Sequence, residues 1–207
     1  HEEHEEDGEE THRVHGGTGM KIAWGITGSG DKINETIKVM KALKAAHPKL
    51  KVEVFLSKAG VTVAKYYRIE DELRGSFDRV WSEVDANTPF LAARLQLGEF
   101  IFVLIAPSTS NTVAKLAVGV ADTLLTNAAL QAVKGYVPVY IMPVDYREGE
   151  TTTTLPSGKK LRLRVRKEDA DNVARLDAME GIHTFESPET IPTILKKHMK
   201  KGNGERD

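Results

Sequence analysis

Three short segments of this 207-residue chain carry hydroxyl side chains, one of them between glycines, in patterns that suit ligand binding. They read Gly-Ile-Thr-Gly-Ser-Gly at 25–30, Leu-Ser-Lys at 56–58 and Pro-Ser-Thr-Ser-Asn-Thr at 107–112. Glycine lets the backbone approach a ligand closely, and the amides that begin a helix favour an anion. The segments therefore predict a site for a phosphate or a neutral polar group. Two plainer interpretations stay open: a ligand-free turn at 25–30 and a helix cap at Ser57.

The composition excludes several other chemistries. The chain has no cysteine, so it contains no disulfide, thiolate metal site or cysteine nucleophile. No apolar run approaches the roughly 18 residues of a membrane helix, and no basic-then-apolar leader precedes Met20. We therefore expect a soluble, cytoplasmic protein without a resident metal.

The first nineteen residues differ from the rest of the chain. They hold seven acidic residues and four of the seven histidines but almost no apolar side chains, so they cannot offset the entropy cost of ordering. We interpret 1–19 as a disordered acidic extension or tag, although its histidine spacing could bind a metal ion. The remainder has 28 basic and 23 acidic residues, a net charge of +5.

Apolar runs that alternate with amphipathic stretches predict an α/β fold, a three-layer Rossmann-like parallel sheet with helices on both faces. In such sheets ligands bind at the carboxyl ends of the strands, where the three segments lie. Strands are predicted at 21–26, 52–56, 77–81, 100–106 and 137–142, and helices at 32–46, 61–73, 88–97, 111–117 and 122–134.

A different pattern follows residue 146. It predicts a β-hairpin of 151–155 and 160–165, a helix at 168–179, a strand at 182–185 and a last helix at 188–198. We treat 20–200 as a single domain and 201–207 as a disordered tail.

The second hairpin strand alternates cations with apolar residues. Its charged face predicts either an edge strand that resists pairing or a surface for an acidic protein or anionic substrate. No aromatic residues interleave the cations, which argues against nucleic acid. The cations are Lys160, Arg162, Arg164 and Arg166.

Together these motifs resemble a known family. The flavoprotein family of phosphopantothenoylcysteine decarboxylase and the lantibiotic peptidyl-cysteine decarboxylases has similar segments. The resemblance rests on 25–30, 107–112 and the sequence Gly-Val-Ala-Asp-Thr-Leu-Leu-Thr at 119–126. Segments 23–32, 87–91 and 153–161 look closer to the archaeal flavoproteins (archaeoflavoproteins), which are similar to the flavin-dependent dihydromethanopterin reductases. The resemblance covers 20–200.

The resemblance implies FMN, bound near subunit contacts of a homo-oligomer built from trimers or their multiples. It places Ser57 at the phosphate end of the cofactor, and we expect the stretch 85–90, with Asn87, to approach the flavin of a neighbouring subunit. The positions that match the cofactor-binding motifs are Gly28, Ser29, Gly30, Ser57, Thr109, Ser110, Asn111, Thr112, Ala121, Asp122, Asn127 and Ala128.

The departures from the family pattern concern the reaction. The decarboxylases have a His before the central strand and a later Pro-x-Met-Asn segment with a Cys, whereas this chain has no His between 81 and 106 and reads Pro-Val-Asp-Tyr at 143–146. We therefore expect no catalytic side chain, and chemistry that is the redox cycle of the flavin.

Two functions stay open, with decarboxylation the least favoured third. One is an electron-transfer flavoprotein that takes electrons from a donor such as ferredoxin. The other is a reductase of a small pterin-like substrate. A pocket beside the flavin large enough for a pterin favours the reductase, and a shallow flavin edge ringed by the basic hairpin favours electron transfer.

Overall fold

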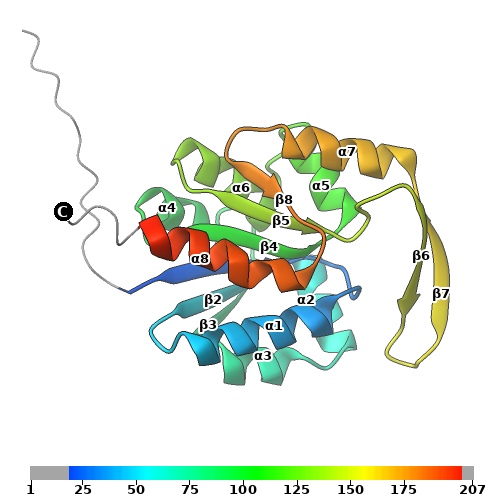
Figure 1. Ribbon diagram of the computed structural model, residues 1–207, viewed down its shortest axis with the longest axis horizontal. Helices are drawn as coiled ribbons and strands as arrows, with labels where there is room; N and C mark the ends of the chain where they lie inside the picture. Colours follow the sequence, from blue (N-terminus) through cyan, green and yellow to red (C-terminus); the bar gives the residue numbers. More distant parts are fainter. Residues whose placement is uncertain (1–18, 202–207) are drawn as a thin grey trace, which may run out of the picture.

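The computed structural model describes residues 19–201 (Figure 1). Residues 1–18 and 202–207, which hold nearly all of the predicted acidic extension, its histidines and the predicted tail, lie outside the described residues. Between residues 19 and 201, no helix combines the length and apolarity needed to cross a bilayer.

A six-stranded parallel sheet forms the centre, in the order β3-β2-β1-β4-β5-β8. Every residue of β4 is buried, as expected of a continuous apolar run covered on both faces. The predicted three-layer α/β fold is confirmed. The strands are β1 Lys21–Ile26, β2 Lys51–Leu56, β3 Arg79–Ser82, β4 Phe102–Ser108, β5 Val139–Pro143 and β8 Ile182–Thr184.

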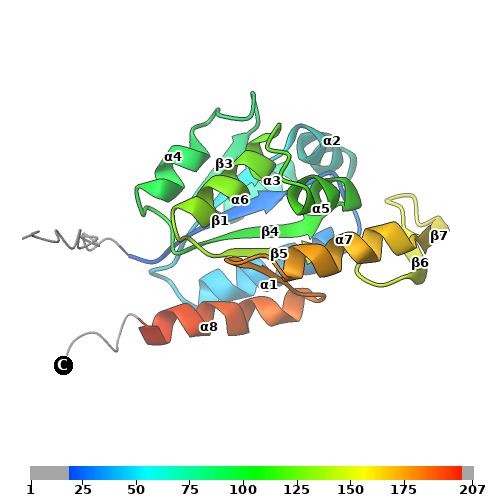
Figure 2. The same ribbon diagram turned by 90° about the horizontal axis from the view of Figure 1, so that it is seen from above.

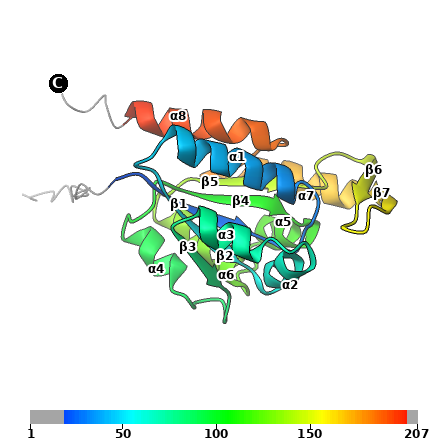
Figure 3. The same ribbon diagram turned by 90° about the horizontal axis from the view of Figure 1, so that it is seen from below.

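Two helical layers cover the sheet, with α1 and α8 on one side and α4, α5 and α6 on the other (Figures 2 and 3). Alternate strand residues serve the two layers: Trp24 packs in the core with α1, α2, α3 and α8, whereas Ala23 packs in the core with α4 to α7. The helices are α1 Ile33–Ala46, α2 Lys58–Tyr66, α3 Glu70–Ser76, α4 Leu91–Gln96, α5 Ser110–Ala117, α6 Leu124–Lys134, α7 Lys167–Asp177 and α8 Ile191–Lys201.

Three predicted helices differ from the observed ones. The helix expected at 61–73 is two helices, because Arg68 between α2 and α3 has a left-handed φ of 56°. The helix expected at 88–97 begins only at Leu91, because Phe90 has a φ of 62°. The last helix follows a short 3-10 turn, η1 Pro188–Thr190.

The predicted hairpin is confirmed and stands apart from the body of the molecule (Figure 1). Its strands, β6 Gly149–Thr154 and β7 Lys160–Val165, pair only with each other. The register sets Thr151 opposite Leu163 on one face and Glu150 opposite Arg164 on the other. Since an isolated two-stranded sheet is marginally stable at best, the uncharged face must find support elsewhere.

Candidate functional site

A pocket of about 310 Å³ lies at the carboxyl ends of β1, β4 and β5. The turn 28–31 after β1 forms one part of its wall, and Thr109 and Ser110 at the start of α5 form another. Val144 and Asp145, which follow β5, complete the part built by the sheet. Because parallel strands end at the same edge, turns far apart in the sequence meet here.

The hairpin and α2 provide the rest of the lining. Thr151, Thr153 and Leu155 come from the first arm of the hairpin, Leu163 comes from the second, and Tyr67 caps the end of α2. These residues add apolar surface to a pocket whose sheet side is rich in hydroxyl groups. The lining therefore suits a ligand with one apolar and one polar part.

Thr27 fixes the relative position of two turns of the pocket. Its side-chain hydroxyl donates to the carbonyl of Pro107 at 2.8 Å and accepts the amide N–H of Thr109 at 3.0 Å. Thr27 is 2% exposed, so both bonds are protected from water. The role of Thr27 cannot be predicted from the sequence alone, because it depends on β1 and β4 being neighbours in the sheet.

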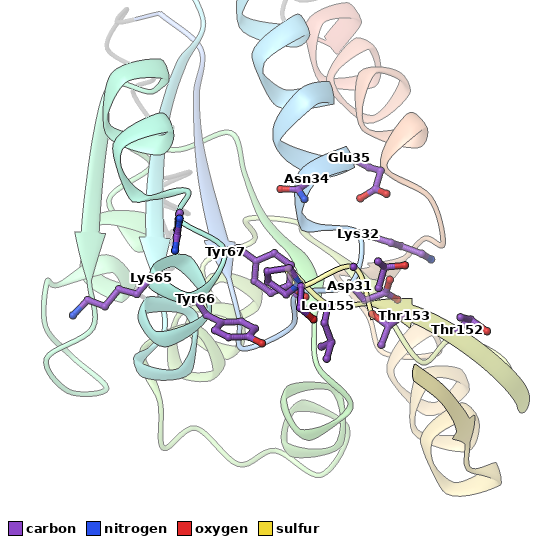
Figure 4. Close-up of a pocket in the computed structure, with 16 residues that line it drawn as sticks. Asp31, Lys32, Asn34, Glu35, Lys65, Tyr66, Tyr67, Thr152, Thr153 and Leu155 are labelled. Carbon is purple, nitrogen blue, oxygen red and sulfur yellow. The ribbon is translucent and has the colours of Figure 1, made fainter. Parts of the chain in front are cut away.

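A larger cleft of about 1120 Å³ adjoins the pocket. The start of α1, the end of α2 and the tip of the hairpin at 152–158 line it (Figure 4). Its lining includes the cations Lys32, Lys65 and Arg68. Asp31 and Tyr67 line both cavities, and Figure 4 shows them close to Leu155, which also lines both.

Of the carboxyl groups that line the two cavities, Asp31 and Asp145 have raised pKa values. Burial, the largest cause, raises the pKa of Asp31, and repulsion from Glu35 and Asp145 adds to it against the opposing effect of Lys32. Burial likewise raises the pKa of Asp145, although a hydrogen bond from Ser110 opposes the shift. Neither acid was among the predicted site residues, although the available signal was their place at the carboxyl edge of the sheet: Asp31 lies in the turn between β1 and α1, and Asp145 lies two residues after β5.

The flavoprotein family profile matches residues 11–192 of the chain. The chain belongs to the flavoprotein family. The resemblance found in the sequence motifs is thereby confirmed.

Relatives of this flavoprotein occur in the archaeon Methanocaldococcus jannaschii. An uncharacterized protein of that organism is 47% identical over 180 residues, which cover 87% of this chain and 96% of the relative. Its dihydromethanopterin reductase (acceptor) is 32% identical over 234 residues, 84% of this chain and 95% of the relative.

A solved structure supports the same relationship. Burkholderia xenovorans DmrB in complex with FMN, described as a cubic protein cage for redox transfer, is 32% identical. It superimposes with a TM-score of 0.76 over 89% of this flavoprotein and 97% of DmrB. The peptidyl-cysteine decarboxylase EpiD, at 17% identity and a TM-score of 0.55, shares the fold.

Five of the predicted cofactor-binding residues of the flavoprotein meet in the 310 Å³ pocket: Gly28, Ser29, Gly30, Thr109 and Ser110. Gly28 is required for packing, because a Cβ atom there would come within 2.6 Å of the Cβ of Ala59 at the start of α2. The glycine thus lets the turn after β1 lie against the neighbouring helix.

Three further predicted residues lie beside the pocket without lining it. Ser57 caps α2 by accepting the N–H of Gly60 at 2.9 Å, which is the plainer interpretation of its motif. Thr112 donates its amide N–H to the Thr109 hydroxyl at 3.2 Å, and Asn111 is exposed on the first turn of α5. Their contacts with FMN stay predictions.

The last four predicted residues lie away from both cavities. Ala121 is exposed, Asp122 forms an exposed ion pair with Lys115 at 2.9 Å, and Ala128 is fully buried in the core. Asn127 donates to the carbonyl of Ala86 at 2.9 Å and so holds the stretch 85–90 that we expect at a subunit contact. A role for these four in cofactor binding also stays a prediction.

Proposed function

We propose that this flavoprotein binds FMN in the 310 Å³ pocket and passes electrons from a reduced carrier, such as ferredoxin, to a small heterocyclic acceptor in the adjoining cleft. The observation that carries the proposal is the 1120 Å³ cleft itself, which shares Asp31, Tyr67 and Leu155 with the pocket. A protein that exchanged electrons only with other proteins would need an exposed flavin edge and no such cleft. The name of the M. jannaschii relative makes dihydromethanopterin the first acceptor to test.

The lining of the pocket fits FMN in its chemistry. Ser29, Thr109 and Ser110 offer hydroxyl groups for a polar ring edge or the phosphate, and Leu155 and Leu163 offer apolar surface for the ring. At the end of β4, beside these hydroxyls, the buried Ser108 side chain has no hydrogen-bond partner among the described residues. Bound FMN would supply the electron transfer, so the chain's own task is to hold and orient it and to exclude water.

Self-association is part of the proposal. Phe90 and Val84 are each 65% exposed and flank the stretch that Asn127 holds, and the hairpin has no sheet neighbour. Exposed apolar residues are typical of a surface that a second copy covers, and the hairpin is a separate segment that a second copy would support. The cage formed by DmrB agrees with this interpretation.

A second candidate function is electron transfer between protein partners alone. The hairpin supports it, but less strongly than its sequence indicates. Arg162 pairs with Glu150 and Arg166 pairs with Asp169, so only Lys160 and Arg164 of the four cations lack an ion pair among residues 19–200. The surface available to an acidic partner is therefore about half of what the alternation predicts.

Reconstitution with FMN tests the proposal. The purified protein should retain flavin absorbance through gel filtration, and Ser110→Leu should weaken retention because it fills the pocket. Ser76→Leu is the matched control, since Ser76 ends α3 at the opposite edge of the sheet. Loaded protein reduced by ferredoxin should be reoxidised by dihydromethanopterin. No retention of FMN would refute the cofactor site, and retention without reoxidation by the pterin would favour the second candidate.

A further inference from the structure

We propose that Asp31 delivers a proton to the acceptor as it is reduced, with Asp145 as the positioning residue that holds this proton in the site. This inference rests on the proposed function, because it assumes that the reduced flavin and the acceptor meet where the pocket joins the cleft.

The position of Asp31 is the first argument. Among the carboxyl groups of residues 19–200, Asp31 is the one that lines both the 310 Å³ pocket and the 1120 Å³ cleft. Asp145 lines the smaller pocket from the end of β5, on a different strand from the one that leads to Asp31. A proton donor for a reaction between two ligands must reach both, and Asp31 lies at their junction.

The absence of a neutralising cation is the second argument. Neither Asp31 nor Asp145 forms an ion pair with any residue between 19 and 200. The ammonium group of Lys32, next to Asp31, donates instead to the carbonyl of Glu186 at 3.0 Å. The guanidinium group of Arg166, the cation that acts on Asp145, is held by Asp169 at 2.6 Å. Neither carboxyl group is therefore paired directly with a cation.

The surrounding charges set the direction of titration. Asp31 is faced by Lys32, which precedes α1, by Glu35 from the first turn of α1, by Asp145 after β5 and by Tyr67 from the end of α2. Burial first, and then the two acids, raise its pKa, whereas Lys32 lowers it. Asp145 in turn is faced by Ser110, Asp169 and Arg166. Two carboxyl groups in one partly buried site share protons, because the second negative charge is disfavoured by the first.

The proton balance of the reaction requires such a donor. Reduction of a C=N bond to CH–NH consumes two electrons and two protons. Bound FMN in its reduced form would supply the two electrons and one of the protons to the carbon. The second proton comes from the O–H bond of Asp31, which breaks as the N–H bond forms. Asp31 is left as a carboxylate and regains a proton from water.

Kinetics of the FMN-loaded protein with dihydromethanopterin test the assignment. Asp31→Asn should slow reduction of the pterin by about a hundred-fold or more, while FMN content and reduction of the flavin by dithionite stay unchanged. Asp145→Asn should move the loss of activity at high pH to a lower pH, because it removes a negative charge that favours protonated Asp31. Asp171→Asn, an exposed ion-pair partner of Lys167 on α7, is the control and should change neither.

A carbon-13 NMR titration of the carboxyl groups without FMN gives a readout independent of turnover. Asp31 should titrate above the ordinary aspartate value of 3.8, and Asp145→Asn should lower its midpoint whereas Asp171→Asn should not. Either of two results would overturn the inference. One is an Asp31→Asn variant that reduces the pterin at the wild-type rate across the pH range, and the other is a titration midpoint of Asp31 that Asp145→Asn does not move. Failure of the wild-type protein to hold FMN or to reduce the pterin would instead refute the proposed function. The titration needs neither FMN nor the pterin, so it distinguishes failure of the inference from failure of the proposed function.

Discussion

Tyr67 lies directly over Gly30: a Cβ atom on Gly30 would come within 2.2 Å of the phenol oxygen. Gly30 belongs to the turn after β1, and Tyr67 follows α2. Both residues line the pocket and the cleft, so their contact lies where the two cavities meet. The glycine is needed at this point for the space it leaves to the tyrosine ring.

Gly30→Ala should therefore displace the ring of Tyr67 into the cavities. The φ angle of Gly30 is not left-handed, so we expect a loss of stability below about 1 kcal/mol. FMN should bind at least ten-fold more weakly in a fluorescence titration. In a Tyr67→Ala background the same substitution should have little further effect, because the clash is gone. Additive losses in the double variant would contradict this account.

Glu53 gives a prediction about pH. Its side chain is 6% exposed on β2, where it accepts two hydrogen bonds of 2.8 Å from Arg94 and one of 2.8 Å from Trp81. Burial alone would raise the pKa of Glu53, but the bonds from Arg94 and Trp81 outweigh it and lower the pKa from 4.5 to about 2. A depressed folded-state pKa stabilises the fold above the unfolded value and loses that effect as pH falls.

Glu53→Gln should consequently lower the free energy of unfolding by about 3 kcal/mol at pH 7, since it removes the buried charge that pairs with Arg94 and leaves Arg94 only the more exposed Glu99. The difference from wild type should shrink as pH falls from about 4.5 towards about 2. Urea unfolding at several pH values measures both. Glu72→Gln, which removes an exposed pair with Lys41 at 2.9 Å, should cost less than about 1 kcal/mol. A difference for Glu53→Gln that does not change with pH would refute this explanation.

The hairpin prediction concerns its two unpaired cations. Lys160→Glu with Arg164→Glu should slow reduction of the flavin by ferredoxin several-fold at low salt, because like charges repel an acidic partner. The effect should fade as salt rises, since the screening length is about 8 Å at physiological ionic strength. Stopped-flow reduction at several salt concentrations measures it, with dithionite as the donor that needs no docking.

Lys196→Glu with Lys200→Glu on α8 makes the same change in net charge at exposed positions away from the hairpin. This control should leave reduction by ferredoxin near the wild-type rate. Equal slowing by both double variants would attribute the effect to net charge alone and exclude docking on the hairpin.

Phe90 connects backbone strain with self-association. A bulky residue with a φ of 62° is strained by about 1–2 kcal/mol, and 65% of this side chain is exposed, so burial within the subunit does not offset the strain. Phe90→Asn with Val84→Ser should keep or raise the stability of the subunit, because asparagine tolerates this backbone. Light scattering after size exclusion should show smaller assemblies. Unchanged assemblies would show that this surface is not a subunit contact.

The sequence predicts the sheet well because its strands are continuous apolar runs that few other structures can bury. The sequence also predicts that Gly28 and Ser110 lie at the same edge of the sheet, because parallel strands have their carboxyl ends at one edge. The helix ends at Arg68 and Phe90 were not predicted, because the local sequence pattern does not indicate a left-handed φ at a residue other than glycine.

The site is only partly readable from the sequence for a related reason. Asp31 and Asp145 follow different strands, and their meeting depends on the spatial order β1-β4-β5, which the sequence order does not reveal. The neutralisation of Arg162 by Glu150 depends in the same way on the register of the hairpin.

The burial of Trp24 has an optical consequence. The indole has no exposed surface and donates its N–H to the carbonyl of Ala106 at 2.7 Å, so it is held rigid and dry in β1. A tryptophan in such surroundings emits at short wavelength, where its emission overlaps the near-ultraviolet absorption of flavins. Because the first glycine of the pocket, Gly28, lies only four residues after Trp24, arrival of the cofactor should quench this emission by energy transfer. The protein thus carries its own reporter, and cofactor loading can be followed in the unlabelled chain.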